Sequence, residues 1–476
     1  MRSIFSKKSH IHFIGIGGIG MSAIALVLAK RGFSVSGSDK QINSQVESLI
    51  AENITIFKNQ EKENITKICS GNNLSPVVVT STAIPENNPE LQEAKKAKLN
   101  ILHRSDILND LVKNQPSILI GGSHGKTTTS TVISTLLALC KEDPTSIIGG
   151  INPYYNNNAH SGLGKFLIAE ADESDGSIIK FKPEIGLLTN LDLDHTNYYA
   201  SIESLIETMQ HFGENSKTLL ANYDCPKIRE NFNAKKWWST KTIKGVDFSG
   251  IPIEQKSDRT IAKYYENEEY LGELNIPIAG LHNLSNVIGG IAACRIAGIP
   301  FKRLESNVIN IQSPGRRFEF RGIWKGRKIY DDYAHHPKEI EAALSLARLL
   351  ADNEIKNNDT QNCKIISVFQ PHRFSRTKVF LKDFAKSLLN SDCIILAPIY
   401  DAGEIEIEGA SSQLLANSIR MINPSMSVLV ATDFEEIINL IKQKTLEGDL
   451  VINMGAGNIN KVWTELNNLN YDPLNN

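Results

Sequence analysis

The sequence has little of several features that would place it in other classes of protein. No apolar run approaches the roughly 18–20 residues that a membrane span needs. Neither sign of charge dominates, because 51 Lys and Arg stand against 53 Asp and Glu and give a formal net charge of −2. We therefore expect no membrane partner and no nucleic-acid partner. The residues before the first strand-like segment carry charges but no signal-peptide core, which favours a cytoplasmic location.

Cysteine is also scarce. The six cysteines are scattered without a Cys-x-x-Cys spacing, and several lie in apolar runs. This pattern favours buried free thiols over disulfides or a zinc site.

The length of 476 residues suggests about three domains.

The most informative motif is Gly-Gly-Ser-His-Gly-Lys-Thr at residues 121–127. It follows an apolar, strand-like run (117–120) and opens a helix-like run (127–140). A glycine-rich turn lets backbone N–H groups face a phosphate, and the start of a helix adds favourable partial charge. Lys126 would reach the β- and γ-phosphates, and the Thr127 hydroxyl would reach Mg²⁺. Ile120 stands where the common P-loop has its first glycine, so this is a compact variant.

A second glycine motif lies near the N-terminus. A buried strand is predicted over 11–16, followed by Gly-Ile-Gly-Gly-Ile-Gly at 15–20, a helix over 21–31 and a strand that ends near Asp39. The pattern is typical of a dinucleotide site, with Asp39 on a ribose. The same geometry can hold the diphosphate of a UDP-sugar. Ser81 and Thr82 follow a further strand (76–80), where they form either a plain turn or part of the ligand crevice.

Two strands of the central region end in possible metal ligands. Strand 166–169 runs into Glu170 and the acidic residues after it, and strand 185–190 runs into Asp192, Asp194 and His195. The carboxyl ends of parallel strands line one crevice, so Lys126, Glu170 and His195 can converge. Mg²⁺ prefers oxygen ligands and keeps several waters, so one or two carboxylates suffice. His195 is either a second metal ligand or a structural hydrogen bonder.

An asparagine-rich segment precedes a predicted helix over 287–297. Asn283 or Asn286 would either cap that helix or present a donor and an acceptor to an adenine edge. A linker is expected near residues 313–319, and strand–helix alternation then resumes. Two clusters rich in His and Arg follow strands in this last region, at 331–337 and 370–376. Arg373 or Arg376 could bind a carboxylate through the planar guanidinium.

Taken together, these motifs make the chain resemble the Mur ligase family of peptidoglycan synthesis. The resemblance covers almost the whole chain and rests on eight segments in the family's order: 15–20, 122–127, 170–175, 194–195, 282–283, 315–319, 331–337 and 370–376. It implies an α/β protein of three domains. These are a Rossmann-like UDP-sugar domain (1–110), a central P-loop-type ATP-binding domain (111–313) and a Rossmann-like C-terminal domain for amino acid and nucleotide (314–476).

The resemblance also implies the reaction. The carboxylate of UDP-N-acetylmuramate would attack the γ-phosphorus of ATP, giving an acyl phosphate and ADP. The amine of L-alanine would then displace phosphate through a tetrahedral intermediate. ATP and Mg²⁺ are the implied cofactors, and Mn²⁺ can substitute. Phosphoryl transfer of this kind depends mostly on positioning and charge neutralisation.

Site residues carry over from the resemblance position by position. The implied catalytic residues are Lys126, His195, His335, Arg373 and Arg376. The implied ATP-binding residues are Gly122, Ser123, His124, Gly125, Lys126, Thr127, Thr128, Asn283 (adenine), Arg317 and Asp332 (ribose). The implied substrate-binding residues are Gly15, Gly17, Gly18, Gly20, Asp39, Ser81, Thr82, Asp172, Glu173, Ser174, Tyr333 and His335. The implied metal ligands are Thr127, Glu170 and His195.

Three other functions compete with this one. A related ligase that attaches a preformed peptide to the same UDP-sugar, for recycling, would differ only in its amino-acid pocket. A nicotinamide-dependent oxidoreductase would account for residues 15–20 but not for Lys126, Glu170 and His195. A non-catalytic ATP-binding regulator would bind nucleotide without turnover.

Overall fold

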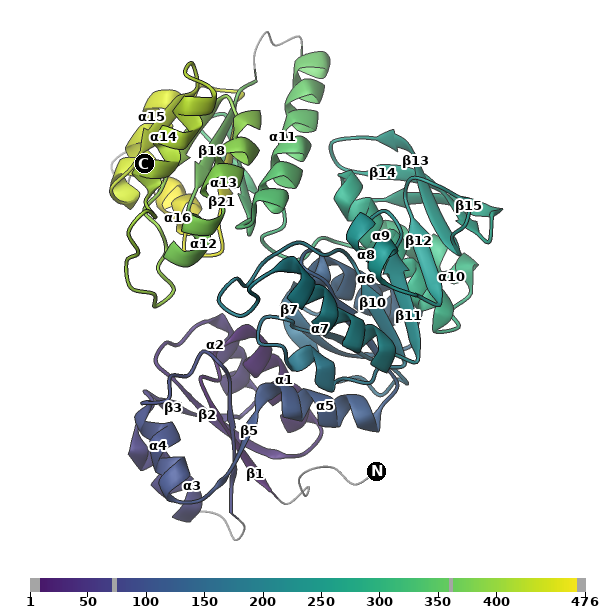
Figure 1. Cartoon of the computed structure of the whole chain (residues 1–476), viewed down its shortest axis with the longest axis vertical. Helices are drawn as coiled ribbons and strands as arrows, with labels where there is room; N and C mark the ends of the chain where they lie inside the picture. Colours follow the sequence, from purple (N-terminus) through teal and green to yellow (C-terminus); the bar gives the residue numbers. More distant parts are fainter. Residues whose placement is uncertain (1–8, 71–74, 359–362, 469–476) are drawn as a thin grey trace, which may run out of the picture.

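The computed structural model describes residues 9–70, 75–358 and 363–468 of the chain. The first eight residues, on which the expectation about a signal peptide partly rests, lie outside these ranges. The described chain forms three α/β units in sequence order, each built on its own sheet (Figure 1). The predicted three-domain α/β fold is therefore confirmed.

The first sheet has five parallel strands in the order β3-β2-β1-β4-β5. Its strands are β1 (His10–Ile14), β2 (Ser34–Asp39), β3 (Thr55–Lys58), β4 (Val77–Thr80) and β5 (Asn100–His103). Its helices are α1 (Ile19–Lys30), α2 (Ser44–Ala51), α3 (Lys62–Ser70), α4 (Pro89–Lys96) and α5 (Arg104–Asn114). Because β4 pairs directly with β1, the loops that follow these two strands lie side by side at a ligand-binding edge.

The second sheet has ten strands in the order β15-β14-β13-β12-β11-β10-β6-β9-β7-β8. Its strands are β6 (Ser117–Gly121), β7 (Thr145–Asn152), β8 (Asn157–His160), β9 (Leu167–Glu170), β10 (Ile185–Leu188), β11 (Thr218–Asn222), β12 (Lys236–Ser239), β13 (Phe248–Gln255), β14 (Thr260–Glu266) and β15 (Glu269–Ile276). Its helices are α6 (Lys126–Leu139), α7 (Ile202–Asn215), α8 (Pro226–Asn231), α9 (Leu281–Ile296) and α10 (Phe301–Asn307). Strand β6 lies between β9 and β10, so all three predicted strand ends meet.

The third sheet has six strands in the order β16-β17-β21-β18-β19-β20. Its strands are β16 (Glu319–Trp324), β17 (Arg327–Asp332), β18 (Ile365–Phe369), β19 (Cys393–Leu396), β20 (Ser427–Val430) and β21 (Leu450–Met454). Its helices are α11 (Pro337–Asn358), α12 (Phe374–Val379), α13 (Leu381–Ser387), α14 (Ser412–Ile422), α15 (Phe434–Lys444) and α16 (Lys461–Asn468). Residues 311–318, around the expected linker, contain neither helix nor strand and connect this unit to the middle one.

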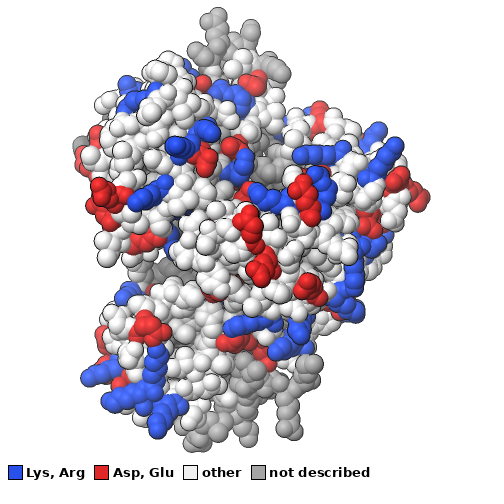
Figure 2. Space-filling model, viewed as in Figure 1, with Lys and Arg blue, Asp and Glu red and all other residues white. Residues whose placement is uncertain are grey.

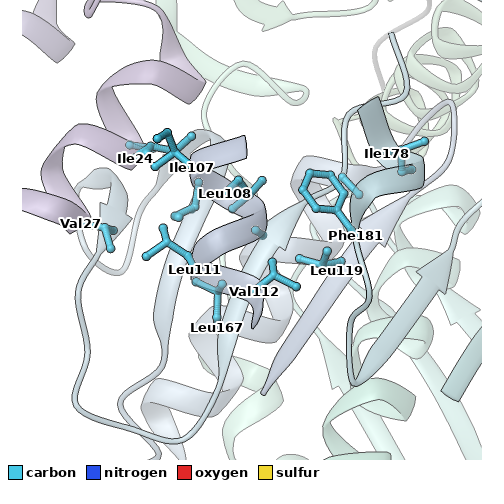
Figure 3. Close-up of a cluster of buried hydrophobic side chains, with 14 of the residues drawn as sticks. Ile24, Val27, Ile107, Leu108, Leu111, Val112, Leu119, Leu167, Ile178 and Phe181 are labelled. Atoms are coloured by element: carbon cyan, nitrogen blue, oxygen red, sulfur yellow. The ribbon is translucent and has the colours of Figure 1, made fainter. Parts of the chain in front are cut away.

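The first two units share one hydrophobic core. Ile24 of α1, together with Ile107 and Leu111 of α5, belongs to the same buried cluster as Leu119 of β6 and Leu167 of β9 (Figure 3). The predicted boundary between residues 110 and 111 falls inside α5 and stays a prediction. All six cysteines are free, and four of them are buried, as the sequence predicted.

The surface agrees with the balanced composition. Lys and Arg are interspersed with Asp and Glu over the face shown in Figure 2, without one sign covering it. Among the described residues, no helix combines the length and the apolar character that crossing a membrane requires.

The N-terminal sheet encloses a polar network around Glu90 at the start of α4. His12 Nε2 lies 2.8 Å from Glu90 Oε1, and Asn64 Nδ2 donates to the same oxygen at 3.0 Å. The Ser38 hydroxyl donates to Glu90 Oε2, while the Ser36 hydroxyl lies 2.7 Å from His12 Nδ1. The backbone carbonyl of Ser38 accepts from the N–H of Gly15, so the network lies directly behind the first glycine motif.

We expect Glu90→Ala to lower the free energy of unfolding by about 3 kcal/mol, because its buried partners lose their acceptor. Glu93→Ala on the same helix is the control, since Glu93 is partly exposed and only loosely paired with Lys96. Its effect should stay within about 0.5 kcal/mol. Urea unfolding followed by circular dichroism measures both variants. A Glu90→Ala protein as stable as the control would contradict the role given to this network.

Candidate active site

The phosphate loop leads from β6 into α6. Gly125 caps α6 with φ at +81°, and a Cβ there would lie 2.4 Å from Asn286 Oδ1, so only glycine fits. No side chain caps the helix, which leaves its first N–H groups for a ligand. Two N–H groups earlier in the loop are already engaged, because Ser123 N and His124 N donate to Asn190. The backbone N–H groups that are left for an anion are thus those of the first turn of α6.

Lys126 lies in a strongly acidic setting. Its Nζ is 2.7 Å from Glu173 Oε1 and donates to the carbonyl of Gly122 at 2.5 Å. Burial alone would lower the pKa of Lys126, but the charges of Glu173, Asp172 and Glu170 outweigh it and raise the pKa above its usual value. The ammonium group therefore stays charged. Glu173, predicted as a substrate contact, is buried, and its Oε2 has no hydrogen-bond partner among the described residues.

Thr127 and Glu170 lie together, as the sequence predicted. The Thr127 hydroxyl donates to Glu170 Oε2 at 3.2 Å. Gly149 N and the Ser130 hydroxyl donate to Glu170 Oε1 at 2.6 and 3.2 Å. The carboxylate is therefore held in one orientation at the end of β9, beside the first turn of α6.

His195 reaches the same place from the loop after β10. Its backbone has φ at +52°, and its Nε2 lies 3.7 Å from Glu173 Oε1 and 3.9 Å from Asp194 Oδ2. No group of three or more His, Cys, Asp or Glu side chains within the described ranges is arranged to hold a metal ion by itself. A metal here would need ligands from a bound substrate or water.

The larger cavity, of about 670 Å³, opens beside the phosphate loop on the side of α9. It is lined from the middle unit by His124, Thr128 and Asn283, and from the C-terminal unit by Arg317 and Asp332. Asp332 accepts backbone N–H groups from Phe318 and Ala334 at 2.8 and 2.7 Å, and burial raises its pKa to about 6. Together with Gly125, six predicted ATP residues thus line one cavity.

The asparagines before the predicted helix do not cap it. Helix α9 begins at Leu281, six residues earlier than predicted, and its N-cap is Gly280. Asn283 and Asn286 therefore lie inside the first turns, and both line the larger cavity. Asn283 Nδ2 donates to the carbonyl of Ala279 at 2.8 Å. The capping interpretation is wrong, and the adenine contact stays a prediction.

The smaller cavity, of about 270 Å³, joins all three units. Gly20 and Arg104 line it from the first unit, and His335 and Glu339 line it from the C-terminal unit. Arg317 also lines it, and the middle unit supplies the remaining polar side chains, which are Ser123, His124, Lys126, Thr127, Glu170, Asp172, Asp194 and His195. Most of the predicted catalytic and metal residues therefore line one cavity.

The predicted UDP-sugar residues divide into two groups. Gly17 N donates to Asp39 Oδ2 at 2.9 Å, so Asp39 holds the glycine loop. A Cβ on Gly15 would lie 2.9 Å from the Ile84 side chain, which puts the segment with Ser81 and Thr82 beside this loop. Gly18 caps α1 without a side-chain bond. Asp172 lies elsewhere, in the smaller cavity, where it accepts Ser174 N and pairs with Arg104.

The two arginines of the C-terminal unit point to different partners. Arg376 is buried, and its guanidinium donates to Asp194 Oδ1 at 2.7 and 3.2 Å. Arg373 has φ at +70°, and its guanidinium lies 3.9 Å from Glu404 on the exposed side. Arg376 therefore links the C-terminal unit to the middle unit, and neither arginine lines the smaller cavity. Their predicted contact with the amino acid stays a prediction.

Histidines are concentrated between these two units. Burial lowers the pKa of His335 and His336 to about 4 and that of His372 to about 3. His336 Nε2 lies 3.3 Å from the carbonyl oxygen of Leu193. The side chain of Tyr333 packs under the guanidinium groups of Arg316 and Arg317. These three histidines are neutral at pH 7.

Two site residues were missed by the sequence analysis. Arg104 pairs with Asp172 at 2.5 Å and directly follows β5, a strand that was not predicted. The signal used elsewhere, a polar residue at the end of a predicted strand, would have found Arg104 only if β5 had been predicted. Glu339 lies in the first turn of α11 and contacts His124, Arg317 and His335. No spacing in the sequence indicates that role.

Three family models match the chain in succession. Residues 10–116 match the model described as Mur ligase family, catalytic domain, and residues 120–294 match the Mur ligase middle domain. Residues 316–457 match the model described as Mur ligase, glutamate ligase domain.

Whole-chain comparisons agree with these models. The chain is 52% identical to a UDP-N-acetylmuramate–L-alanine ligase of Prochlorococcus marinus (strain MIT 9303), over 98% of this chain and 96% of the relative. It is 49% identical to the same-named protein of Synechococcus sp. (strain CC9311), with the same coverage.

Among solved structures, a UDP-N-acetylmuramate–alanine ligase from Thermotoga maritima shares the fold. The TM-score is 0.80, at 23% identity, over 98% of this chain and 99% of that one. A murein peptide ligase from Psychrobacter arcticus 273-4 matches with a TM-score of 0.70, at 20% identity, over 97% and 98% of the two chains.

The lowered pKa values of the three histidines predict how the free energy of unfolding depends on pH. Unfolded His binds protons near its ordinary pKa of 6.5, whereas folded His335, His336 and His372 bind them only near pH 3–4. The unfolded state therefore takes up more protons between these values, so the free energy of unfolding should fall as pH drops from about 6.5 to about 4. Thermal unfolding at pH 7.5, 6 and 5 measures this. The decline should be smaller in His336→Gln, and an equal decline in both proteins would contradict the role of His336.

Proposed function

The chain belongs to the Mur ligase family, and we propose that it joins L-alanine to the carboxyl group of UDP-N-acetylmuramate at the expense of ATP, for peptidoglycan synthesis. One observation carries the proposal. A single cavity is lined by Gly20 from the first glycine motif, by the phosphate loop with Lys126, and by His335 of the C-terminal unit. A UDP-sugar, a nucleotide and an amino acid can each approach this cavity from a different unit. The 49–52% identical relatives that bear this activity's name support it.

The first step is activation of the carboxylate. Its oxygen attacks the γ-phosphorus of ATP, the bond to the bridging oxygen breaks, and ADP leaves. Lys126 stays charged and lies at the first turn of α6, so it neutralises charge on the transferring phosphoryl group. Its present partner Glu173 holds the ammonium group in place until a phosphate competes for it.

Thr127 and Glu170 suit a Mg²⁺ ion. Both present oxygen donors to the same point, and Mg²⁺ binds to proteins through one or two carboxylates together with substrate phosphates and water. When bound, the ion supplies positive charge to the β- and γ-phosphates. We assign His195 to a second ion. The described residues offer no complete protein cage, which fits ions that arrive with the nucleotide.

The second step is attack of the L-alanine amine on the acyl phosphate. The C–N bond forms, a tetrahedral intermediate collapses, and inorganic phosphate leaves. The amine loses a proton, for which we assign His335 as the acceptor, because His335 is neutral above about pH 4 and lines the cavity. Asn283 and Asp332 are assigned to adenine and ribose in the larger cavity. The reaction is placed in the cytoplasm, where ATP is available.

Phosphate release tests the proposal. The purified protein is given ATP, Mg²⁺ and UDP-N-acetylmuramate, with L-alanine, with a short tripeptide or without an acceptor, and each reaction is repeated without Mg²⁺. We expect release that requires both L-alanine and Mg²⁺. Release with the tripeptide alone would identify the recycling ligase instead. No release from folded protein that still binds ATP would indicate a regulator.

We expect Lys126→Ala to lower kcat by at least about 100-fold, because the charge that neutralises the phosphoryl group is lost. Binding of UDP-N-acetylmuramate, measured by calorimetry without ATP, should change little, since its diphosphate is assigned to the first unit. Lys141→Ala is the matched control, as Lys141 is an exposed lysine just beyond the other end of α6. Loss of UDP-sugar binding in a folded Lys126→Ala protein would contradict the separation of the two sites.

A further inference from the structure

Glu339 contacts three predicted site residues at once. Its Oε1 lies 3.4 Å from His124 Nδ1 of the phosphate loop and 3.6 Å from Arg317 Nη1. Its Oε2 lies 3.4 Å from His335 Nδ1 and accepts the backbone N–H of His335 at 3.1 Å. The two carboxylate oxygens thus face different parts of the site.

Glu339 also lies where the two cavities adjoin. It lines both of them, as do His124 and Arg317, and its side chain is only 11% exposed. Burial would raise the pKa of Glu339, but its contacts with His335, His124 and Arg317 hold that pKa well below the usual value. A fixed negative charge therefore separates the nucleotide cavity from the cavity that holds His335.

We propose that Glu339 is a positioning residue that couples the nucleotide cavity to the acceptor side of the smaller cavity, by holding His124 and Arg317 with one oxygen and His335 with the other. The inference rests on the proposed function. A nucleotide that contacts His124 and Arg317 would hold the Glu339 side chain in one orientation. Glu339 would in turn hold the His335 side chain in the position where the amine binds. Placement errors of about 1 Å can cost about 100-fold in rate, so such a support has a large effect without touching the reacting atoms.

A merely structural role makes a different prediction. An acidic residue in the first turn of a helix stabilises that helix through the helix dipole. If Glu339 did only this for α11, its removal would lower stability and leave the Michaelis constants of the folded enzyme unchanged.

The variants Glu339→Gln and Glu339→Asp separate these roles. In Glu339→Gln, KM for ATP and KM for L-alanine should each rise about tenfold or more, since both oxygens lose their charge. Binding of UDP-N-acetylmuramate without ATP should stay unchanged. In Glu339→Asp, which keeps the charge, both Michaelis constants should rise less than in Glu339→Gln. Glu354→Gln is the control, because Glu354 lies on the same helix about 22 Å further along its axis, where it pairs with Lys328 of β17.

A double-mutant cycle with His124→Asn completes the test. If the two residues act as a unit, the combined effect on kcat/KM for ATP will be clearly smaller than the product of the single effects. Strictly multiplicative effects, or Michaelis constants in Glu339→Gln equal to those of Glu354→Gln, would overturn the inference. These outcomes require a wild-type enzyme with L-alanine-dependent turnover, so a wild-type protein without it would count against the proposed function rather than against Glu339.

Discussion

The buried ion pair between Arg376 and Asp194 fixes the geometry on which the rest of the site depends. It joins helix α12 of the C-terminal unit to the loop that carries His195, with two hydrogen bonds from Arg376 to one carboxylate oxygen. Burial disfavours the charged form of Asp194, but Arg376 outweighs it and holds the pKa of Asp194 far below its usual value. Removing one member of such a pair costs about 3–5 kcal/mol because the other is left buried and uncompensated. The C-terminal unit lines both cavities, with Asp332 in the larger one and His335 in the smaller one, and this contact helps to hold it there.

The same site concentrates charge in a chain that is almost neutral as a whole. Lys126 faces Glu173, Asp172 and Glu170, while Glu339 faces His124, Arg317 and His335. The surrounding carboxylates stabilise the charged Lys126, and Arg317 together with the contacts to the two histidines stabilises the charged Glu339, so both groups remain ionised despite burial. A ligand with phosphates can replace the carboxylate partners of Lys126 without leaving that cation unpaired. The electrostatic preorganisation of the site therefore exists before substrates bind.

Sequence patterns predicted the features that depend only on residues close to one another along the chain. The glycine motifs at 15–20 and 121–127, and the polar ends of β9 and β10, lie at strand ends as predicted. The edge strands β3 and β5 were not predicted, because they are only four residues long and their side chains are exposed or half-buried. The antiparallel strands β14 and β15 were also missed; β14 buries every second residue (Thr260, Ala262 and Tyr264), a period of two that could have indicated it, whereas β15 is mostly exposed or half-buried. Glu339 and the partner of Arg376 depend on how separate units meet, which no local spacing encodes.

The shared core of the first two units has a consequence for motion. Ile24, Ile107 and Leu111 pack with Leu119 and Leu167, so the first two sheets can separate only by exposing apolar surface to water. The C-terminal unit is tied to them through polar contacts and a connecting segment without helix or strand. We therefore expect movement of the C-terminal unit to occur about a hinge at residues 311–315, because Arg316 and Phe318 already hydrogen-bond to that unit. A crosslink that spans this hinge would hold the molecule in one state, whereas a crosslink between α1 and β7 would change nothing.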